Sequence, residues 1–332
     1  MKPATIYDVA RRAGVSHQTV SRYVSGFEGI RPATRERVES AIAELGYRRN
    51  SAARQLRTRR INRLGVLAHR IDQTGPARVI TGATRAAQEH GFLLDIVVTH
   101  DLDLDSIDTA LAVVAEHQVL GVLAAAQTEL VLERIQLLAP TVPFVMDSKV
   151  AFPAGGPSFN EFAGQLAADH LMDLGHRNVG YVSGPVDWIG ASGRLAGFLA
   201  RIRERGGTVR WTRAGDWSAG SGYAAWESLS ADEREVTAIA TGNDSMAIGL
   251  ISAAQSSGIT VPTDLSVIGN DDMEETRFLL PALTTIALDF EGEGRAMVES
   301  LLAKALPEQF PGDPTEVGPP RLITRASTQA AR

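Results

Sequence analysis

The sequence predicts an N-terminal all-α head with a helix-turn-helix, followed by a larger α/β core built on parallel sheets. Residues 1–46 contain three short helical stretches with a glycine turn between the first two. From residue 63 onward, apolar strand-like runs alternate with amphipathic stretches, which is typical of parallel α/β sheets. The charge also divides the chain at this point.

The head is basic and the rest of the chain is acidic. Residues 1–60 hold 13 Lys and Arg against 5 Asp and Glu, a balance of +8, whereas the whole chain of 332 residues carries −6. A basic segment attracts phosphate polyanions, and an acidic body limits contact with them elsewhere. A solvated charged face would explain the same asymmetry, so charge alone leaves nucleic-acid binding open.

Composition excludes several classes of protein. The chain has no cysteine, which rules out disulfides, thiolate metal sites and a cysteine nucleophile. No apolar run approaches the roughly 18 residues that span a bilayer. Residues 1–8 lack the apolar segment of a secretory signal. We therefore expect a cytoplasmic protein without membrane contact.

The first helical stretch has an apolar face and a clear start and stop. Thr5 can cap its beginning, with Asp8 in the first turn, and Gly14 follows where the backbone must turn. The apolar face recurs at helical spacing: Ile6, Val9, Ala10 and Ala13.

The second and third stretches complete the predicted helix-turn-helix. Ser16 can cap a helix over residues 17–24, whose apolar side holds Val20 and Val24. The third starts near Pro32 and ends at Gly46, with an apolar stripe of Val38, Ile42 and Leu45. The second helix also carries side chains that hydrogen-bond: His17, Gln18, Ser21 and Arg22. This chemistry favours DNA bases over the alternative, a small bundle used for protein contact.

The core alternates strands and helices in two series. The first places strands at 64–68, 93–98, 119–124 and 143–146, and helices near 76–90, 106–118 and 128–138. The second places strands at 178–183, 237–241 and 265–269, and helices near 161–173, 191–205, 219–228 and 244–256. Because ligands bind at the carboxyl ends of parallel strands, the polar residues at such ends are candidates: His69, Asp147, Asn243 and Asp271.

The run from Thr5 to Arg22, TIYDVARRAGVSHQTVSR, resembles the DNA-binding signature of the lactose-repressor (LacI) family. The resemblance continues through TRERV (34–38) and AELGY (43–47) and covers essentially the whole chain. GDWSA (215–219), Asn243-Asp244, Asp271-Asp272 and PALTTI (281–286) most resemble the galactoside-binding repressor from which the family takes its name. The resemblance implies a two-lobed, periplasmic-binding-protein-like core with a ligand in its cleft.

For DNA, the resemblance implies that the second helix lies in the major groove. His17, Gln18 and Arg22 are then candidates for base contacts, since Gln pairs two-pronged with adenine and Arg with guanine. His17 stands where the galactoside-binding repressor has a tyrosine, so the operator can differ. The remaining candidates would contact phosphates or position the head: Thr5, Tyr7, Ser16, Thr19 and Ser21.

Four segments follow from this comparison: a DNA-binding domain at 1–46, a hinge at 47–62, a two-lobed effector-binding and dimerisation domain at 63–324, and a tail at 325–332. Asn50 can cap a short hinge helix, which also holds Arg54. In the family, the leucine corresponding to Leu56 wedges into the minor groove and kinks the operator. An ordinary basic linker is the alternative.

Four side chains of the core suit a neutral polyol ring. Arg194 offers a planar donor fork, Asp271 two acceptor oxygens, Asn243 both a donor and an acceptor, and Trp217 a flat apolar face. Each has a structural alternative: Asp271 as a loop cap, Arg194 in a surface ion pair, Trp217 in the core. The resemblance maps further residues to the pocket or its rim: His69, Pro76, Val79, Asp147 and Phe290.

The sequence thus predicts a repressor whose operator affinity changes when a galactoside-like sugar binds. A different sugar or a purine is the alternative effector, and a sugar-binding protein without DNA regulation is a more distant one. Hydrolase, phosphate-loop and HExxH motifs are absent, so we expect no enzyme, no cofactor and no metal. A homodimer on a palindromic operator is expected, and no leucine heptad follows residue 306 to make a tetramer.

Overall fold

The computed structural model describes residues 4–24, 26–47, 61–99, 103–116, 118–125, 128–138, 142–146 and 156–332. The chain divides into two compact units, Met1–Ile61 and Asn62–Arg332. None of the helices in the described ranges is long and apolar enough to cross a membrane.

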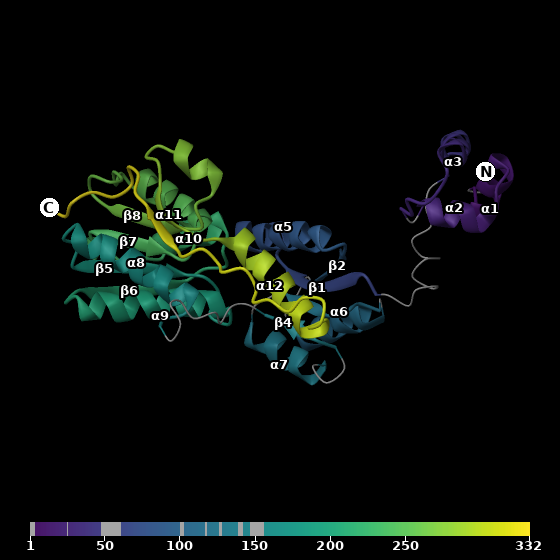
Figure 1. Ribbon diagram of the computed structural model, residues 1–332. Helices are drawn as coiled ribbons and strands as arrows, with labels where there is room; N and C mark the ends of the chain where they lie inside the picture. Colours follow the sequence, from purple (N-terminus) through teal and green to yellow (C-terminus); the bar gives the residue numbers. More distant parts are fainter. Residues whose placement is uncertain are drawn as a thin grey trace. The chain divides into compact units, whose positions relative to one another are not determined.

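The first unit contains the three predicted helices (Figure 1): α1 (Ile6–Ala13), α2 (His17–Val24) and α3 (Pro32–Leu45). Thr5 and Asp8 form a reciprocal capping box at the start of α1. Gly14 ends that helix in the left-handed conformation, at φ 64°, as the turn requires. A small core unites the three helices: Val9, Ala10, Ala13, Val20, Val38 and Ala41.

The second unit consists of two lobes, as predicted. Lobe 1 has a fully parallel sheet of order β2-β1-β3-β4. Its strands are β1 (Arg63–His69), β2 (Leu93–Thr99), β3 (Val122–Ala124) and β4 (Phe144–Val145). Its helices are α5 (Thr74–Glu89), α6 (Leu104–Glu116), α7 (Glu129–Leu138) and α12 (Phe290–Ala305), the last of which packs on α5.

Lobe 2 has a six-stranded sheet of order β10-β9-β8-β7-β5-β6, in which the β9–β10 pair alone is antiparallel among these described strands. Its strands are β5 (Asn178–Ser183), β6 (Thr208–Ala214), β7 (Ala238–Thr241), β8 (Ser266–Asn270), β9 (Thr284–Ala287) and β10 (Arg321–Ile323). Its helices are α8 (Phe159–Asp173), α9 (Ile189–Glu204), α10 (Ala219–Glu227) and α11 (Asp244–Ser256), with 3₁₀ turns η1 (Glu233–Glu235) and η2 (Glu274–Phe278).

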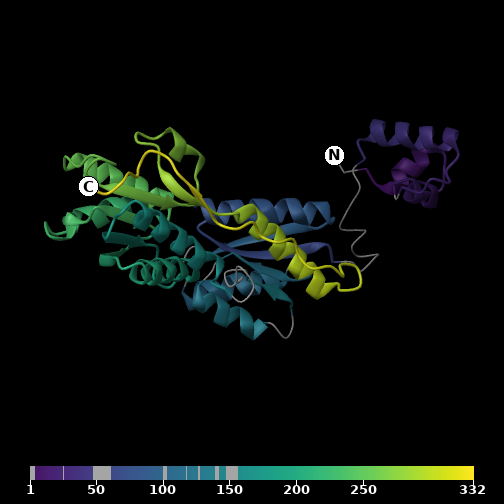
Figure 2. The ribbon, with the colours of Figure 1, turned by 60° about the vertical axis from the view of Figure 1, so that its left-hand side comes forward.

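The chain passes between the lobes more than once. After β9 in lobe 2 it enters α12, which lies beside α5 of lobe 1, and it then returns to lobe 2 to form β10 (Figures 1 and 2). The lobes are therefore joined by adjacent crossing segments, an arrangement that allows their relative orientation to change while each sheet stays intact.

The C-terminal residues differ from the expectation of a tail at 325–332. The Ser327 side chain is fully buried, where its Oγ accepts from the Thr284 amide at 2.8 Å and donates to the Val267 carbonyl at 2.6 Å. His176 and Ser266 hydrogen-bond the Gln329 carbonyl at 3.0 and 3.4 Å. This segment is part of lobe 2, because its backbone and side chains pair with groups that the sheet would otherwise leave unsatisfied.

Candidate DNA-binding surface and ligand pocket

Helix α2 presents a polar face to solvent. His17, Gln18 and Arg22 are exposed, whereas Val20 on the opposite side is fully buried in the core of the head. Ser16 caps the helix by accepting from the Thr19 amide at 3.1 Å. Helix α2 is thus held by its apolar side while three side chains able to hydrogen-bond remain accessible to a groove of DNA.

Side chains near the polar face of α2 pack against it and position its residues. The Tyr7 ring lies 5.3 Å from the His17 ring, between centroids, and Tyr7 is itself exposed. The Arg22 guanidinium lies 5.6 Å over the Phe27 ring. On the inner side, the Tyr23 hydroxyl donates to Glu39 of α3 at 2.8 Å. The spacing of residues in the sequence did not predict these aromatic contacts of His17 and Arg22.

The described residues include part of the predicted DNA-contacting set. Thr5 is engaged in its capping box, and Thr19 and Ser21 are half-buried on α2. The hinge candidates Asn50, Arg54 and Leu56 lie outside the described residues.

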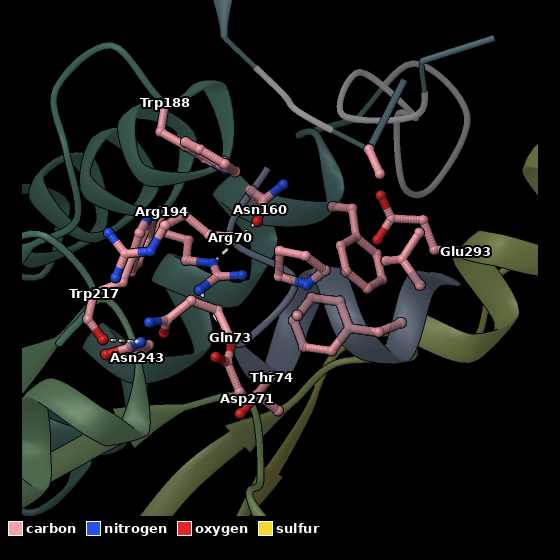
Figure 3. A pocket seen from close by; sticks show the side chains of 17 residues that line it. Arg70, Gln73, Thr74, Asn160, Trp188, Arg194, Trp217, Asn243, Asp271 and Glu293 are labelled. Carbon is pink, nitrogen blue, oxygen red and sulfur yellow. Dashed lines mark hydrogen bonds and ion pairs between the residues drawn. The ribbon is translucent and has the colours of Figure 1, made fainter. Parts of the chain in front are cut away.

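A pocket lies between the two lobes (Figure 3), with about 690 Å³ of open space that includes solvent at its mouth. Lobe 1 contributes residues from the start of α5 and of α12. Lobe 2 contributes the starts of α8, α9 and α11 and the ends of strands, where the predicted Arg194, Trp217, Asn243 and Asp271 come together. Four residues distant in sequence thus meet in one wall.

Arg194, on α9, is the most connected of these residues. Its Nε donates to Asn160 Oδ1 at 3.0 Å, and its Nη1 donates to the Gly242 carbonyl at 2.6 Å and to Asp271 Oδ1 at 3.2 Å. The side chains of Arg194 and Asp271 are 8% and 6% exposed, so this is a buried ion pair rather than the surface pair considered from the sequence. No described residue accepts a hydrogen bond from Arg194 Nη2, so this nitrogen can donate to a ligand.

Asp271 follows β8 in a conformation that side chains rarely adopt, at φ 113°. Burial raises the pKa of its carboxyl from 3.8 to about 6, although Arg194 and Arg78 act to lower it. Arg78 of α5 also donates to the Asp271 carbonyl at 3.2 Å, a hydrogen bond from lobe 1 to lobe 2. The neighbouring Asp244 is buried too, and burial raises the pKa of its carboxyl well above the ordinary value.

Asn243 and Trp217 are positioned together. Asn243 caps α11 by accepting from the Met246 amide at 2.9 Å, and it donates to the Trp217 carbonyl at 3.0 Å. Trp217 has φ 72°, and its ring packs so closely on Gly184 that any side chain there would collide with it. Asp216 accepts from the Ser218 amide at 2.9 Å and so closes the loop that carries Trp217.

The other predicted pocket residues divide into three groups. Pro76, Val79 and Phe290 line the pocket. His69 does not lie among the lining residues: its Nδ1 is 2.9 Å from the Thr99 carbonyl, and its ring packs 5.9 Å from the ring of Trp188, which does line the pocket. Asp147 lies outside the described residues.

The structure adds lining residues that the sequence analysis did not propose. Trp188 and Asn160 stand at the beginnings of α9 and α8, and Glu293 lies one turn into α12. Trp188 and Asn160 could have been predicted, because residues at the beginnings of helices that follow strands often line ligand sites. Among the described residues, no group of three His, Asp or Glu side chains is arranged to hold a metal ion.

Two family descriptions match the chain. Residues 5–50 match the bacterial regulatory proteins of the lacI family, and residues 168–328 match a periplasmic binding protein-like domain. These matches fall on the head and on the C-terminal part of the core, which contains most of lobe 2 and also α12 of lobe 1.

Curated relatives match along nearly the full length. The HTH-type transcriptional repressor PurR of Edwardsiella ictaluri is 34% identical over 98% of this chain and 96% of its own length. The lactose operon repressor of Escherichia coli K12 is 31% identical over 99% of this chain and 92% of its own.

Solved structures agree with the fold. The lac repressor dimer bound to operator and the anti-inducer ONPF superimposes with a TM-score of 0.87 at 29% identity, covering 99% of this chain and 100% of that one. A complex of the transcriptional regulator CelR with cellobiose gives 0.69 at 26% identity, covering 98% and 99%.

Proposed function

Because the chain belongs to the lacI family of bacterial regulatory proteins, we propose that it is a DNA-binding repressor controlled by a small ligand bound between the lobes of its core. The family consists of transcriptional regulators rather than enzymes. The polar face of α2 supports the first half of the proposal, and the pocket around Arg194 supports the second.

At the operator, α2 would enter the major groove with its exposed face toward the bases. Gln18 and Arg22 are one helical turn apart and both exposed, so they can reach neighbouring base pairs. Tyr7, Ser16, Thr19 and Ser21 would contact phosphates or position α2, and Thr5 would act through its cap. The hinge residues Asn50, Arg54 and Leu56 complete the proposed contact set.

In the pocket, we propose a neutral sugar, with a galactoside first. The buried Arg194–Asp271 pair carries this proposal: the two charges cancel, while fork and carboxylate can donate to and accept from neighbouring hydroxyls. Asn243 adds an amide, and the Trp217 ring offers a flat face for C–H groups.

A purine is the second candidate, because the relatives include a repressor named PurR. The geometry of the two tryptophans favours the sugar. The Trp188 and Trp217 rings meet at 81°, with centroids 6.5 Å apart, so they do not form parallel walls around a flat base. A sugar ring needs one such face and hydrogen bonds at its rim.

A homodimer on a palindromic operator fits the surface of the core. Phe278 and Leu280 of lobe 2 are 74% and 91% exposed, and Leu93 and Ile96 are exposed on the edge strand β2 of lobe 1. Large exposed apolar side chains mark protein contacts where they form a contiguous patch, and we propose that these residues contribute to the dimer interface. Two copies would place two heads on two half-sites, and sedimentation at micromolar concentration checks the stoichiometry.

The proposal is tested by selecting bound duplexes from a random pool and then measuring binding by fluorescence anisotropy with and without sugars, glycosides and purines. A thermal-shift panel identifies which compounds bind, since a ligand of the folded state raises its melting temperature. Arg22→Ala should cost about 1–3 kcal/mol and relax the base preference at one position. Arg11→Ala, on the exposed side of α1, should weaken binding uniformly if at all.

Two results would contradict it. If Arg22→Ala selected the same sequences with the same stringency, α2 would not be the recognition helix. A sugar that binds the core while the chain shows no salt-dependent DNA binding would favour a binding protein without regulation.

A further inference from the structure

The pocket has a second polar end, distant from Arg194 and formed by Glu293. Glu293 lies on α12, three residues after Phe290 and therefore on the same helical face, and both residues line the pocket. Figure 3 shows Glu293 on the opposite side of the pocket from Arg194, Trp217 and Asn243. The residue is 8% exposed.

The wall between the two ends is mainly apolar. Pro76, Val79, Phe290 and Phe159 lie there, and the Phe290 ring carries the Arg78 guanidinium 5.8 Å above it. Placing a carboxylate in such a wall costs free energy unless polar partners compensate for the lost water. An ionised carboxylate has about four acceptor positions, so Glu293 can accept from a ligand in addition to its contacts within the chain.

From this arrangement we infer that the effector is a disaccharide whose second ring donates hydroxyl groups to Glu293. This inference rests on the proposed sugar-binding function and specifies its ligand class. Asp271 and Glu293 are acceptors at opposite ends of one pocket, and hydroxyl groups are the neutral donors that suit both. The C–H faces of the linked rings match the apolar wall between them.

A glycoside with an alkyl group at this end would fit less well. Its apolar tail would displace water from Glu293 and supply no hydrogen bond in return, which leaves a buried acceptor less well satisfied. Glu293 therefore selects for the second ring, whereas Arg194 and Asp271 bind the first.

The test uses calorimetric titration of the full chain with three kinds of probe. These are disaccharides with galactosyl or glucosyl first rings, the methyl and isopropyl glycosides of the same first rings, and 2-aminoethyl glycosides. Wild type is compared with Glu293→Gln and Glu293→Leu. The matched control is Glu291→Gln, the same change on the same helix at a residue that pairs with Arg85 and does not line the pocket.

We expect wild type to bind a disaccharide about tenfold or more tightly than the isopropyl glycoside of its first ring. Glu293→Leu should reverse that order, Glu293→Gln should retain part of it, and Glu291→Gln should leave it unchanged. Melting temperatures of the free variants establish that each is folded.

Three outcomes would overturn the inference. The first is an isopropyl glycoside that binds wild type as tightly as every disaccharide. The second is a disaccharide preference that survives Glu293→Leu. The third is an aminoethyl glycoside that binds more tightly than the disaccharides in a Glu293-dependent way, which would assign this end to a cation. Failure of every carbohydrate to bind would instead refute the proposed sugar effector, and the inference with it.

Discussion

Arg194 and Asp271 illustrate how single residues of the pocket are held ready for a ligand. Two charges have been removed from water, which costs several kcal/mol for each ion unless hydrogen bonds compensate. Arg194 receives that compensation from Asn160 and the Gly242 carbonyl, whereas Asp271 receives less, and burial raises the pKa of its carboxyl to about 6. The carboxylate therefore has more to gain from a ligand that donates to it.

Asp271 should make sugar binding depend on pH. Its folded-state pKa is raised above 3.8, so between that value and about 6 the folded state takes up a proton, and the contribution of Asp271 to stability falls as the pH rises through this window. The ionised carboxylate accepts hydrogen bonds from sugar hydroxyls more strongly than the protonated acid does. Affinity measured by calorimetry should therefore fall as the pH is lowered below about 6, by up to about tenfold per pH unit.

The control for this prediction is Asp271→Asn. It keeps the size of the side chain and removes the titrating group, so its weaker binding should be flat across the same range. A wild-type affinity that stays constant between about pH 7.5 and about pH 5 would show that Asp271 does not accept from the ligand as an ion.

Three residues that line the pocket have strained backbone conformations. Arg70, Trp217 and Asp271 line the pocket and have φ of 51°, 72° and 113°, a region that costs non-glycine residues free energy. Surrounding contacts hold them there: Asn243 holds the Trp217 carbonyl, and Arg78 holds the Asp271 carbonyl. Such positions are typical of ligand sites, where exact placement of a side chain outweighs its local cost.

At the scale of elements, glycine pairs set how closely the helices pack. Helices α8 and α9 cross at Gly164 and Gly197, where an added Cβ would lie 2.0 Å from the carbonyl oxygens of Arg194 and Glu161. The pair α5 and α12 meets in the same way at Gly82 and Gly294. Helices α10 and α11 do so at Gly222 and Gly249. Close packing of α8 on α9 places Arg194 against Asn160.

Gly164→Ala should destabilise the core and weaken ligand binding. In an exposed helix, replacing Gly by Ala stabilises by up to about 1 kcal/mol. Here the methyl group collides with the Arg194 carbonyl, so α9 must shift, and the net cost should be about 1–3 kcal/mol. Urea denaturation measures the stability, and the thermal shift produced by a bound sugar measures the displacement of Arg194.

Gly312→Ala is the matched substitution, because a Cβ at that position meets nothing within 4 Å. It should leave the denaturation midpoint and the ligand response close to those of wild type. Equal midpoints for Gly164→Ala and Gly312→Ala would show that the close crossing of α8 and α9 is not required.

Elements with clear local signals were predicted well from the sequence. Helix α11 begins at Asp244 as expected, because Asn243 supplies its cap, and β5 was placed at its exact bounds because its apolar run is buried on both faces. Strand β6, at the sheet edge, was missed although its alternating polar and apolar residues are a strand signal. Strand β10, with three residues paired antiparallel to β9, has no local signal of its own.

The ligand site was predicted only in part, for a similar reason. Arg194, Trp217, Asn243 and Asp271 were proposed from their chemistry and from the family resemblance, and all four line one pocket in the structure. Glu293 lies on α12, which joins lobe 1 only because the chain crosses back from lobe 2. No spacing within the sequence indicates that crossing, so long-range topology decides which carboxylates share a pocket.

At the scale of the whole molecule, control of DNA binding requires coupling between the pocket and the head. Coupling is reciprocal: a sugar that weakens operator binding by some factor is itself bound more weakly by that factor when operator is present. A ligand can shift the lobes only through contacts that differ between their orientations. The described contacts that join lobe 1 to lobe 2 at the pocket are therefore the places where such differences arise.

The hydrogen bond from Arg78 offers the most direct test of these contacts. It reaches from α5 of lobe 1 to the Asp271 carbonyl in lobe 2, beside the carboxylate that we propose binds the ligand. Arg78→Met keeps an unbranched apolar side chain, and it removes the hydrogen bond between the lobes together with the guanidinium over Phe290. Sugar affinity in the absence of DNA should change by about threefold or less. The factor by which sugar alters operator affinity should move toward one, from a coupling that is typically about 1–3 kcal/mol.

Arg85→Met provides the comparison, since Arg85 also lies on α5 but pairs with Glu291 of the same lobe in an exposed salt bridge. Anisotropy titrations of operator with and without sugar measure both factors. If Arg78→Met and Arg85→Met retained the same coupling as wild type, the signal would have to pass through other contacts between the lobes.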